Sequence, residues 1–227
     1  MYEDKRNVWR ENRERNLDWF IHEQIAAFLP SGSLGRILDY GAGNSPYRSG
    51  LEFDKYVSAD LAQNSLGSID HIIRPGQPLP LADGSFDLVL LLDVLEHVSD
   101  PDYVLVEIRR LLGPEGRLIM SIPFIYREHE TPFDYARYTS FGVENLLGRH
   151  GGYVVRRNKV GSVGFTLLSI FLSRGIVNGE RIRQGLLGRS VNLVIRKAMP
   201  LILPFLMATP NPDDGIYHHL LIEAGFK

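Results

Sequence analysis

The length, composition and charge of the chain indicate a single globular domain and exclude several kinds of site. Its 227 residues suffice for one α/β domain with an elaboration, and a hydrophobic fraction of 44% allows a core of normal size. The formal net charge of -2 provides no overall field that would attract nucleic acid, so no nucleic-acid partner is expected. The absence of cysteine excludes disulfides, thiolate metal ligands and a cysteine nucleophile.

Membrane-spanning and secretory segments are not expected from the sequence. No stretch reaches the roughly 18–20 uninterrupted apolar residues that cross a bilayer. Residues 1–15 are dense in charge and lack the apolar centre of a signal peptide. A cytoplasmic protein is therefore expected, with peripheral contact at the inner membrane face as a second expectation.

The apolar pattern predicts alternating helices and strands over the first two thirds of the chain. A helix is expected over residues 5–29, where apolar side chains recur on one face and charged side chains on the other. A buried strand at 36–40 and a glycine-bearing turn follow. The later expected elements are strands at 55–60 and 68–73, a wholly apolar central strand at 86–92, a helix at 101–112, a strand at 117–122, a helix at 139–149 with Thr139 or Ser140 as its N-cap, and two final strands at 153–159 and 216–224. This alternation predicts parallel βαβ units, in which helices cover both faces of one sheet.

Residues 163–212, between the last two expected strands, differ from the rest of the chain in composition. They combine apolar runs such as Phe165–Leu172 with several arginines. Two interpretations stay open. Residues 163–208 could form a basic amphipathic segment that lies on a membrane surface or covers a lipid-like acceptor, or the segment could be a lid or a homodimer surface.

The turn after the first strand, Asp39-Tyr40-Gly41-Ala42-Gly43, has the composition of a cofactor loop. Its glycines let the backbone turn sharply and approach a ligand without a Cβ in the way. A dinucleotide-binding loop would carry a third glycine where this chain has Pro46, and Asp39 would repel a pyrophosphate. S-adenosylmethionine (SAM) carries a sulfonium and an ammonium group, so an acid beside the loop favours SAM. A simple tight turn is the alternative.

Asp60 ends the second expected strand, roughly 20 residues after the loop. At that spacing a carboxylate can accept hydrogen bonds from both ribose hydroxyls of a nucleoside. A solvated strand end is the other interpretation of Asp60. The loop and Asp60 together favour a nucleoside ligand.

On these residues, and on further motifs in the same order, the sequence resembles the class I SAM-dependent methyltransferases, specifically the type 11 group typified by ubiquinone and menaquinone methyltransferases. The matching stretches are Ile37–Gly43, Ala59–Leu61, Leu79–Val89, Asp93–Val98 and Leu111–Leu118. The resemblance implies a Rossmann-like, seven-stranded, mostly parallel sheet with helices on both faces, an antiparallel last strand and a helical insertion before that strand. It implies one methyltransferase domain over residues 1–227, divided into an N-terminal helix (1–34), a SAM-binding core (35–162), the insertion or lid (163–212) and a C-terminal strand (213–227).

The resemblance also implies which residues bind the cofactor SAM. They are Asp39, Tyr40, Gly41, Ala42, Gly43, Asp60, Leu61, Leu92 and Asp93. The loop would face the methionine part of SAM, Asp60 the ribose and Leu61 the adenine. Many relatives bind the adenine amine with an acid shortly before the Leu-Pro pair, where this chain has Arg74-Pro75-Gly76-Gln77. Gln77 or backbone groups would have to take over, since Asp70 lies too early.

Methyl transfer from SAM depends mainly on placing the acceptor, because the sulfonium already activates the methyl group. Positioning contributes on the order of 7–11 kcal/mol, and a general base adds about 10²–10⁴-fold for a hydroxyl acceptor. The catalytic candidates are His97, His129 and Tyr135, with Glu130 as a further base. No metal is expected. His218 and His219 are expected to point to opposite faces of a strand, which argues against a metal site there.

The loop over residues 127–139, which contains His129 and Tyr135, is dense in histidine, acidic, arginine and tyrosine side chains. It resembles the His-Pro-Asp-Tyr-x-Arg-Tyr-Thr segment of a bacterial subgroup of these enzymes that is often associated with cell-surface glycan genes. A structural role is equally open, in which Asp134 pairs with Arg137 beneath packed tyrosines. His97 likewise has a structural interpretation, as a histidine bonded to the backbone at the start of a helix.

The resulting expectation is a SAM-dependent methyltransferase that acts on a small-molecule, glycan or lipid-linked acceptor, at oxygen by family frequency. One alternative is a non-catalytic SAM-binding regulatory protein, which the missing adenine acid leaves open. The other is a nicotinamide-dependent enzyme, which Asp39 and Pro46 disfavour.

Overall fold

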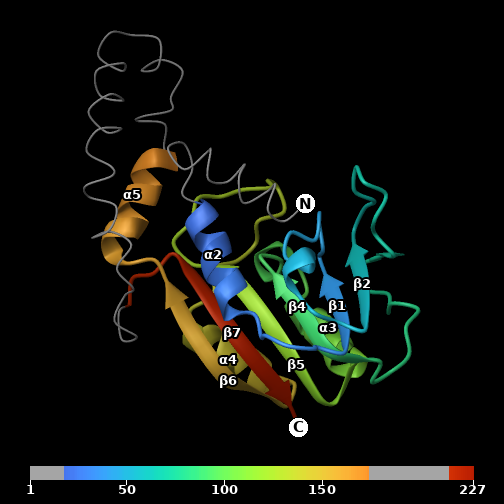
Figure 1. The fold of residues 1–227 in the computed structure, drawn as a ribbon. Coiled ribbons are helices and arrows are strands. Elements are labelled where there is room, and N and C mark those ends of the chain that lie inside the picture. Colours follow the sequence, from blue (N-terminus) through green and yellow to red (C-terminus); the bar gives the residue numbers. More distant parts are fainter. Residues whose placement is uncertain (1–17, 174–214) are drawn as a thin grey trace.

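The computed structural model describes residues 18–173 and 215–227 of the chain (Figure 1). The first part of the expected N-terminal helix and most of the expected insertion therefore lie outside the described residues. No described helix combines the length and the apolar character needed to cross a membrane.

Seven strands form one sheet in the order β3-β2-β1-β4-β5-β7-β6. The strands are β1 (Arg36–Tyr40), β2 (Lys55–Asp60), β3 (His71–Ile72), β4 (Phe86–Leu92), β5 (Leu112–Pro123), β6 (Gly152–Val160) and β7 (His219–Phe226). From β3 to β5 the neighbouring strands run parallel, and β7 runs antiparallel to both β5 and β6. The predicted seven-stranded, mostly parallel sheet with an antiparallel last strand is thereby confirmed.

Strand β3 is shorter than the sequence pattern predicts. The backbone N–H groups of Ser68 and Ile69 donate to the side chains of Asn64 and Gln63 instead of to a neighbouring strand. Only His71 and Ile72 then pair with the end of β2. Local side-chain hydrogen bonds compete with the sheet here, as Asn and Gln can do near turns.

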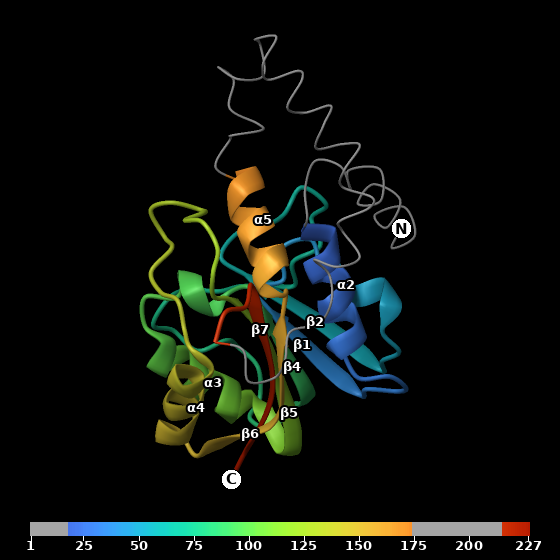
Figure 2. The same ribbon diagram turned by 90° about the vertical axis from the view of Figure 1, so that its left-hand side faces the viewer.

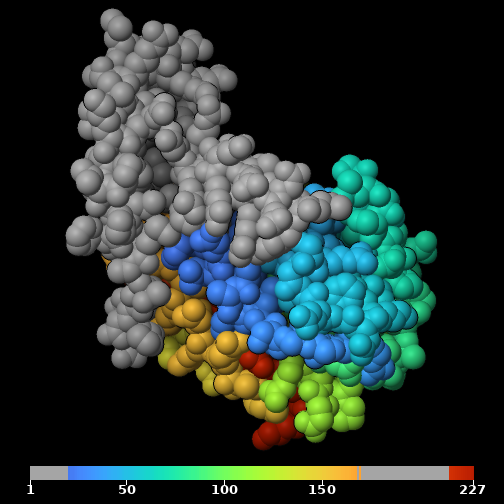
Figure 3. Space-filling model, in the orientation of Figure 1, coloured from blue at the N-terminus to red at the C-terminus, as the bar shows by residue number. Residues whose placement is uncertain are grey.

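Helices cover both faces of the sheet, as the alternation predicts. They are α2 (Asp18–Phe28), α3 (Pro101–Leu111), α4 (Ser140–Arg149) and α5 (Val163–Ser173), with two single 3₁₀ turns, η1 (Arg48–Gly50) and η2 (Leu95–His97). Figure 2 shows α3 and α4 on one side of the sheet and α2 on the other. In the space-filling view, α2 (blue) lies across its face of the molecule between the segments that contain β6 (orange) and η1 (cyan) (Figure 3).

The starts of α3 and α4 are both capped by side chains. The carboxylate of Asp100 accepts a hydrogen bond from the Tyr103 backbone N–H at 3.0 Å, and Pro101 occupies the first turn of α3. The hydroxyl of Thr139 accepts a hydrogen bond from the Gly142 N–H at 3.0 Å. The expected first-turn proline and the expected Thr139 cap are confirmed.

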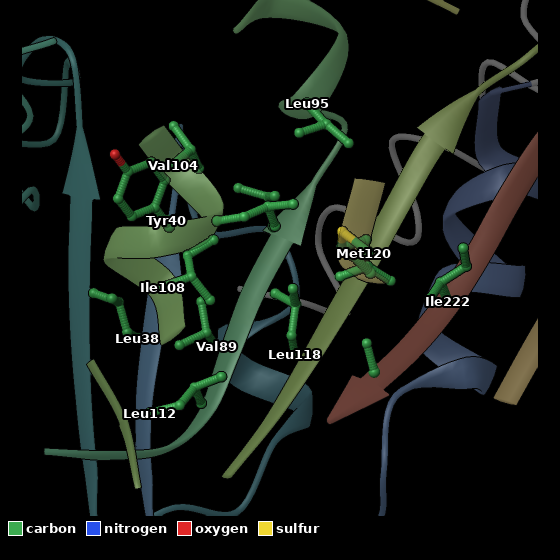
Figure 4. Packing of buried hydrophobic residues seen from close by; sticks show 14 of the residues in the cluster. Leu38, Tyr40, Val89, Leu95, Val104, Ile108, Leu112, Leu118, Met120 and Ile222 are labelled. Carbon is green, nitrogen blue, oxygen red and sulfur yellow. The ribbon is translucent and has the colours of Figure 1, made fainter. Parts of the chain in front are cut away.

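Strand β4 lies at the centre of two apolar layers. On one face, Val89 packs with Val104 and Ile108 of α3 (Figure 4), and Leu91 and residues of α4 belong to the same cluster. On the other face, Leu88 and Leu90 pack with α2. A strand covered on both faces reads as a nearly continuous apolar run, which is the pattern of residues 86–92. Because β1, β2, β4 and β5 are parallel, the loops that follow them meet at one edge of the sheet, where ligands bind in such folds.

Candidate active site

The first pocket, of about 440 Å³, opens at the edge where β1, β2 and β4 end. Its lining comes from the loops after these strands, from the segments that follow β3 and β5, and from the first turn of α3. The lining residues are Tyr40, Gly41, Gly43, Asp60, Leu61, Ile73, Pro75, Gly76, Asp93, Val94, His97, Val98, Ser99, Asp100, Tyr103, Val104 and Glu130. Six of the nine cofactor residues implied by the resemblance are in this set.

The glycine loop reaches this pocket in a conformation that requires glycine. Gly41 has a φ of 78°, and a Cβ on it would lie 2.3 Å from Val94 Cγ2, so no other residue fits without rearrangement. Gly43 also has a positive φ, of 52°, but a Cβ there would meet nothing within 4 Å. Gly43 therefore borders open space, where a ligand can approach the backbone. Ala42 is buried, and its N–H donates to Ala59 O at 3.0 Å.

Asp60 holds the loop from the end of β2. Its Oδ2 accepts a hydrogen bond from Gly43 N at 2.7 Å, and its Oδ1 accepts one from Leu61 N at 2.6 Å. The carboxylate lies on the pocket wall, and the side chain of Leu61 is 63% exposed beside it. An acid and an exposed apolar side chain at this edge suit the hydroxyls and the base of a nucleoside.

Asp39 lies beneath the loop rather than on the pocket wall. It is buried, and Tyr56 donates its hydroxyl hydrogen to Asp39 Oδ2 at 2.5 Å. Burial raises the pKa of Asp39 to about 6, against the opposing effect of the hydrogen bonds from Tyr56 and Ser45. The structure thus gives Asp39 a supporting contact with β2, and any direct contact with a cofactor stays a prediction.

The two expected floor residues, Leu92 and Asp93, point in different directions. Leu92 packs against the apolar cluster on the α2 face, whereas Asp93 lines the pocket with a φ of 54°. Ser121 donates its hydroxyl hydrogen to Asp93 Oδ1 at 2.6 Å, and His219 Nε2 lies 3.5 Å from the same oxygen. Burial acts to raise the pKa of Asp93, but His219 and Ser121 hold it down at about 2. The carboxylate is therefore charged.

The missing adenine acid is not supplied by Asp70. Its Oδ2 accepts hydrogen bonds from the N–H and the hydroxyl of Ser58, at 2.8 and 2.9 Å, which ties it to β2. Pro75 and Gly76 line the pocket at the corresponding place, so backbone groups face a ligand there. With Asp60, the open face of Gly43 and this backbone rim, the residues present fit an adenosyl ligand.

The second pocket, of about 330 Å³, adjoins the first. It is lined by Ile21, His22, Asp93, Glu96, His97, Pro123, Tyr126, His129, Glu130 and His219. Asp93, His97 and Glu130 line both pockets, so they form a shared wall. The sequence predicted His97 and His129 as catalytic candidates, and the structure brings the two side chains together at this wall.

His97 and His129 face each other at close range. Their Nε2 atoms are 3.1 Å apart, and the rings are inclined at 72°. His97 Nδ1 lies 3.0 Å from the carbonyl oxygen of Phe133, and His129 Nδ1 lies 3.1 Å from Asp134 Oδ2. Each ring is therefore oriented through its far nitrogen.

Asp134 takes part in both of the roles considered for its loop. Arg137 donates to both carboxylate oxygens of Asp134, one of them at 2.7 Å, so the expected structural pair is present. The same pairing holds the pKa of Asp134 well below its usual range, with burial opposing it and His129 assisting. A charged Asp134 is thus fixed in place to orient His129.

Glu96 is a residue of this site that sequence reasoning missed. Its side chain is fully buried, and neither carboxylate oxygen has a hydrogen-bond partner among the described residues. Burial raises the pKa of Glu96 to about 8, and the charge of Asp93 adds to this. The sequence did contain a sign of this residue, since Glu96 is an acid directly before His97 in an otherwise apolar turn.

Tyr135 is not part of either pocket. Its side chain is 52% exposed, and its contribution to the site is a backbone N–H that donates to Glu96 O at 2.8 Å. The loop over residues 127–139 is thereby held against η2.

The expectation for His218 and His219 is wrong. Their rings stack at 4.8 Å, and their Nδ1 atoms are 2.7 Å apart, so both side chains lie on the same side of the chain. The physical reason is that β7 begins at His219, so the alternation of a strand does not include His218. Burial lowers the pKa of His218 to about 3, with His219 assisting.

Part of the chain is similar to known methyltransferases. A model described as "Methyltransferase domain" matches residues 38–120. The chain is 33% identical over 84 residues to a ubiquinone/menaquinone biosynthesis C-methyltransferase of Pseudoalteromonas translucida, across 37% of this chain and 33% of that protein. It is 34% identical over 124 residues to a ubiquinone biosynthesis O-methyltransferase of Cereibacter sphaeroides, across 45% of this chain and 49% of that protein. The matched part thus spans between a third and a half of the length of these relatives.

Solved structures show the same fold. In a complex between the Haloferax volcanii Trm112 methyltransferase activator and a methyltransferase, one chain superposes with a TM-score of 0.58 at 17% identity, across 98% of this chain and 94% of that chain. At this identity the likeness concerns the fold alone. The domain match over residues 38–120 and the shared fold support a class I SAM-dependent methyltransferase, whose cofactor is S-adenosylmethionine.

Proposed function

We propose that this protein transfers the methyl group of SAM to an oxygen of an acceptor held in the second pocket. The observation that carries the proposal is the wall of Asp93, His97 and Glu130 that the two pockets share. A cofactor in the first pocket and an acceptor in the second would meet at this wall. SAM supplies a methyl group that its sulfonium has already activated.

On the cofactor side, backbone and acid groups would hold SAM. Asp60 would accept hydrogen bonds from the ribose hydroxyls, and the exposed side chain of Leu61 would lie against the adenine. The open face of Gly43 would let the methionine part approach the loop. The buried carboxylate of Asp39 would support the loop from below through Tyr56.

On the acceptor side, His129 is the proposed general base. Its Nδ1 faces the carboxylate of Asp134, so this nitrogen carries the hydrogen and Nε2 is left free to take a proton. His97 stands beside it in the same arrangement, with its Nδ1 facing a carbonyl oxygen. A base of this kind serves a hydroxyl acceptor, which is why oxygen is proposed. Tyr135 lines neither pocket, so its side chain would touch only an acceptor that extends beyond the second pocket.

The acceptor classes proposed are a small molecule, a glycan precursor or a lipid-linked molecule. The two relatives above are named for methyl transfer to carbon and to oxygen in quinone biosynthesis, so their names support a small or lipid-like acceptor without choosing the atom. Contact of residues 163–208 with a membrane and the formation of a homodimer stay predictions, since most of that segment lies outside the described residues. Co-sedimentation with anionic vesicles and light scattering would test them.

The experiment for the proposed function separates binding from turnover. Calorimetry with SAM, S-adenosylhomocysteine and NAD measures which cofactor binds, and release of S-adenosylhomocysteine is then followed with catechols, sugar nucleotides and polyprenyl-linked sugars as acceptors. SAM binding with acceptor-dependent release supports the proposal. SAM binding without release for any acceptor would favour the non-catalytic alternative, and NAD binding without SAM binding would contradict both.

A further inference from the structure

Three potential metal ligands converge on one point at the wall between the pockets. A carboxylate oxygen of Glu96 and the Nε2 atoms of His97 and His129 all lie within 4.8 Å of one another. His97 Nε2 and His129 Nε2 are 3.1 Å apart, and Glu96 Oε1 lies 3.7 Å from the first and 3.8 Å from the second. The point equidistant from these three atoms is about 2.1 Å from each, which is the length of Zn–N and Zn–O bonds in proteins. We call Glu96, His97 and His129 the histidine cluster.

The hydrogen-bond partners of the two rings leave lone pairs at this point. A carbonyl oxygen of Phe133 and a carboxylate oxygen of Asp134 are acceptors only, so each facing Nδ1 must carry the hydrogen. In the neutral rings both Nε2 atoms are then unprotonated, and two acceptors face each other at 3.1 Å. The two lone pairs repel each other unless a cation lies between the two nitrogens.

The buried carboxylate of Glu96 is a second, independent reason to expect a cation at this point. Neither of its oxygens has a hydrogen-bond partner among the described residues, and the side chain has no exposure to solvent. Within the described parts of the chain, its ion-pair neighbours are His97 and His129. A buried acid without a partner is costly for the fold, and a bound cation would remove that cost.

The ligands are also supported as metal ligands usually are. Ligating histidines typically donate their second N–H to a carboxylate or a backbone carbonyl, which fixes the ring. Asp134 provides the first kind of support, for His129, and Phe133 the second, for His97. Asp134 is itself held by Arg137, so the support is rigid.

We propose that the histidine cluster binds one divalent first-row transition-metal ion, such as Zn²⁺, Mn²⁺, Fe²⁺ or Co²⁺. Two imidazole nitrogens favour these ions over Mg²⁺ and Ca²⁺, which prefer oxygen ligands. Three protein ligands leave coordination positions open, as in catalytic metal sites. Because His97 lines both pockets, an oxygen of a bound molecule could fill an open position. The proposal departs from the expectation that no metal is needed. With the ion bound, His129 Nε2 is a ligand and cannot also be the general base, so the metal would replace that role.

Metal binding can be tested without SAM or an acceptor, so its failure leaves the proposed methyl transfer untouched. Tag-free protein is dialysed against a chelator and then freed of the chelator. It is titrated with Co²⁺, whose visible absorption band becomes more intense when the ion leaves its six water ligands for a four- or five-coordinate protein site, and with Zn²⁺ by calorimetry. The expected result is one ion per chain. Excess Zn²⁺ should also raise the melting temperature of the wild-type protein.

Variants of each ligand connect the binding to the cluster. Glu96→Gln, His97→Ala and His129→Ala should each abolish the cobalt band at one equivalent, whereas Asp134→Asn should weaken binding about 10–100-fold. His71→Ala, on the far edge strand β3, is the matched control and should bind as the wild type does. Melting curves identify any variant that fails to fold. If His129→Ala is such a variant, His129→Gln replaces it.

Two results would overturn the proposal. One is a wild-type protein that takes up neither Co²⁺ nor Zn²⁺ at one equivalent, which would leave a proton shared between the two histidines as the occupant. The other is binding that survives both His129→Ala and Glu96→Gln, which would place the ion elsewhere in the chain.

Discussion

The first and second pockets adjoin, yet the chain builds them by different means. The first pocket is a backbone structure, in which main-chain atoms bond to main-chain atoms, as Gly41 N does to Ala59 O at 2.8 Å. The second pocket depends on side chains from η2, the loop over residues 127–139 and the start of β7. Apart from Asp60 and Asp93, side chains should therefore contribute little to the first pocket, whereas single side chains should matter throughout the second. Substitutions in the two pockets should therefore differ in what they change.

The sharpest test of the second pocket is His129→Ala. Turnover with an active acceptor should fall about 10²–10⁴-fold, because the substitution removes either a general base or a metal ligand. SAM affinity should stay within about twofold, since His129 is not among the residues that line the first pocket. Steady-state kinetics and calorimetry measure the two quantities. Unchanged turnover would remove His129 from the chemistry, and His71→Ala serves as the control.

The acid beneath the loop predicts a pH dependence of stability. Folded Asp39 keeps its proton up to pH of about 6, whereas the unfolded chain loses it near 3.8. The folded state therefore binds more protons between these values, and the free energy of unfolding should fall by roughly 2–3 kcal/mol as pH rises through that window. Asp39→Asn keeps an acceptor for Tyr56 and should lose this contribution. Urea unfolding at pH 4 and pH 7 measures it, and equal slopes for the two proteins would contradict the prediction.

Gly41→Ala tests the backbone of the first pocket. Its Cβ would lie 2.3 Å from Val94 Cγ2 at a φ of 78°, so the loop must move. Strain of roughly 1–3 kcal/mol predicts SAM binding about 10–100-fold weaker. Gly67→Ala is the matched control, because Gly67 has a φ of 61° with nothing within 4 Å of its Cβ. If both variants bound SAM equally well, the close approach to Val94 would not matter.

Tyr135→Phe should have the smallest effect of the four. The side chain is 52% exposed and the contact it makes with Glu96 is through the backbone, which the substitution preserves. Turnover and melting temperature should change little, by about twofold or less in turnover. A larger loss of turnover at constant stability would show that the hydroxyl reaches the acceptor. The acceptor site would then extend beyond the residues that line the second pocket.

The same contrast explains what could be predicted from the sequence. The glycine loop and Asp60 are set by local geometry at strand ends, so motifs and spacing sufficed to find them. Glu96 could not be found in this way, because its isolation depends on a loop some 40 residues later whose N–H groups, at Tyr135 and Ala136, close over η2. The faces of His218 and His219 were predicted wrongly because the pattern cannot say at which residue a strand begins.

The start of β7 has a further consequence for how the chain can vary. Val160, at the end of β6, pairs with His219, so the 58 residues between them leave and rejoin the sheet at neighbouring positions. Apart from α5, whose Phe165 packs in the core, the length of this connection can change without shifting β6 or β7. The returning residue, His219, lines the second pocket and lies 3.5 Å from Asp93. A change in this connection would therefore reach the second pocket through His219, and the wall that the two pockets share through Asp93.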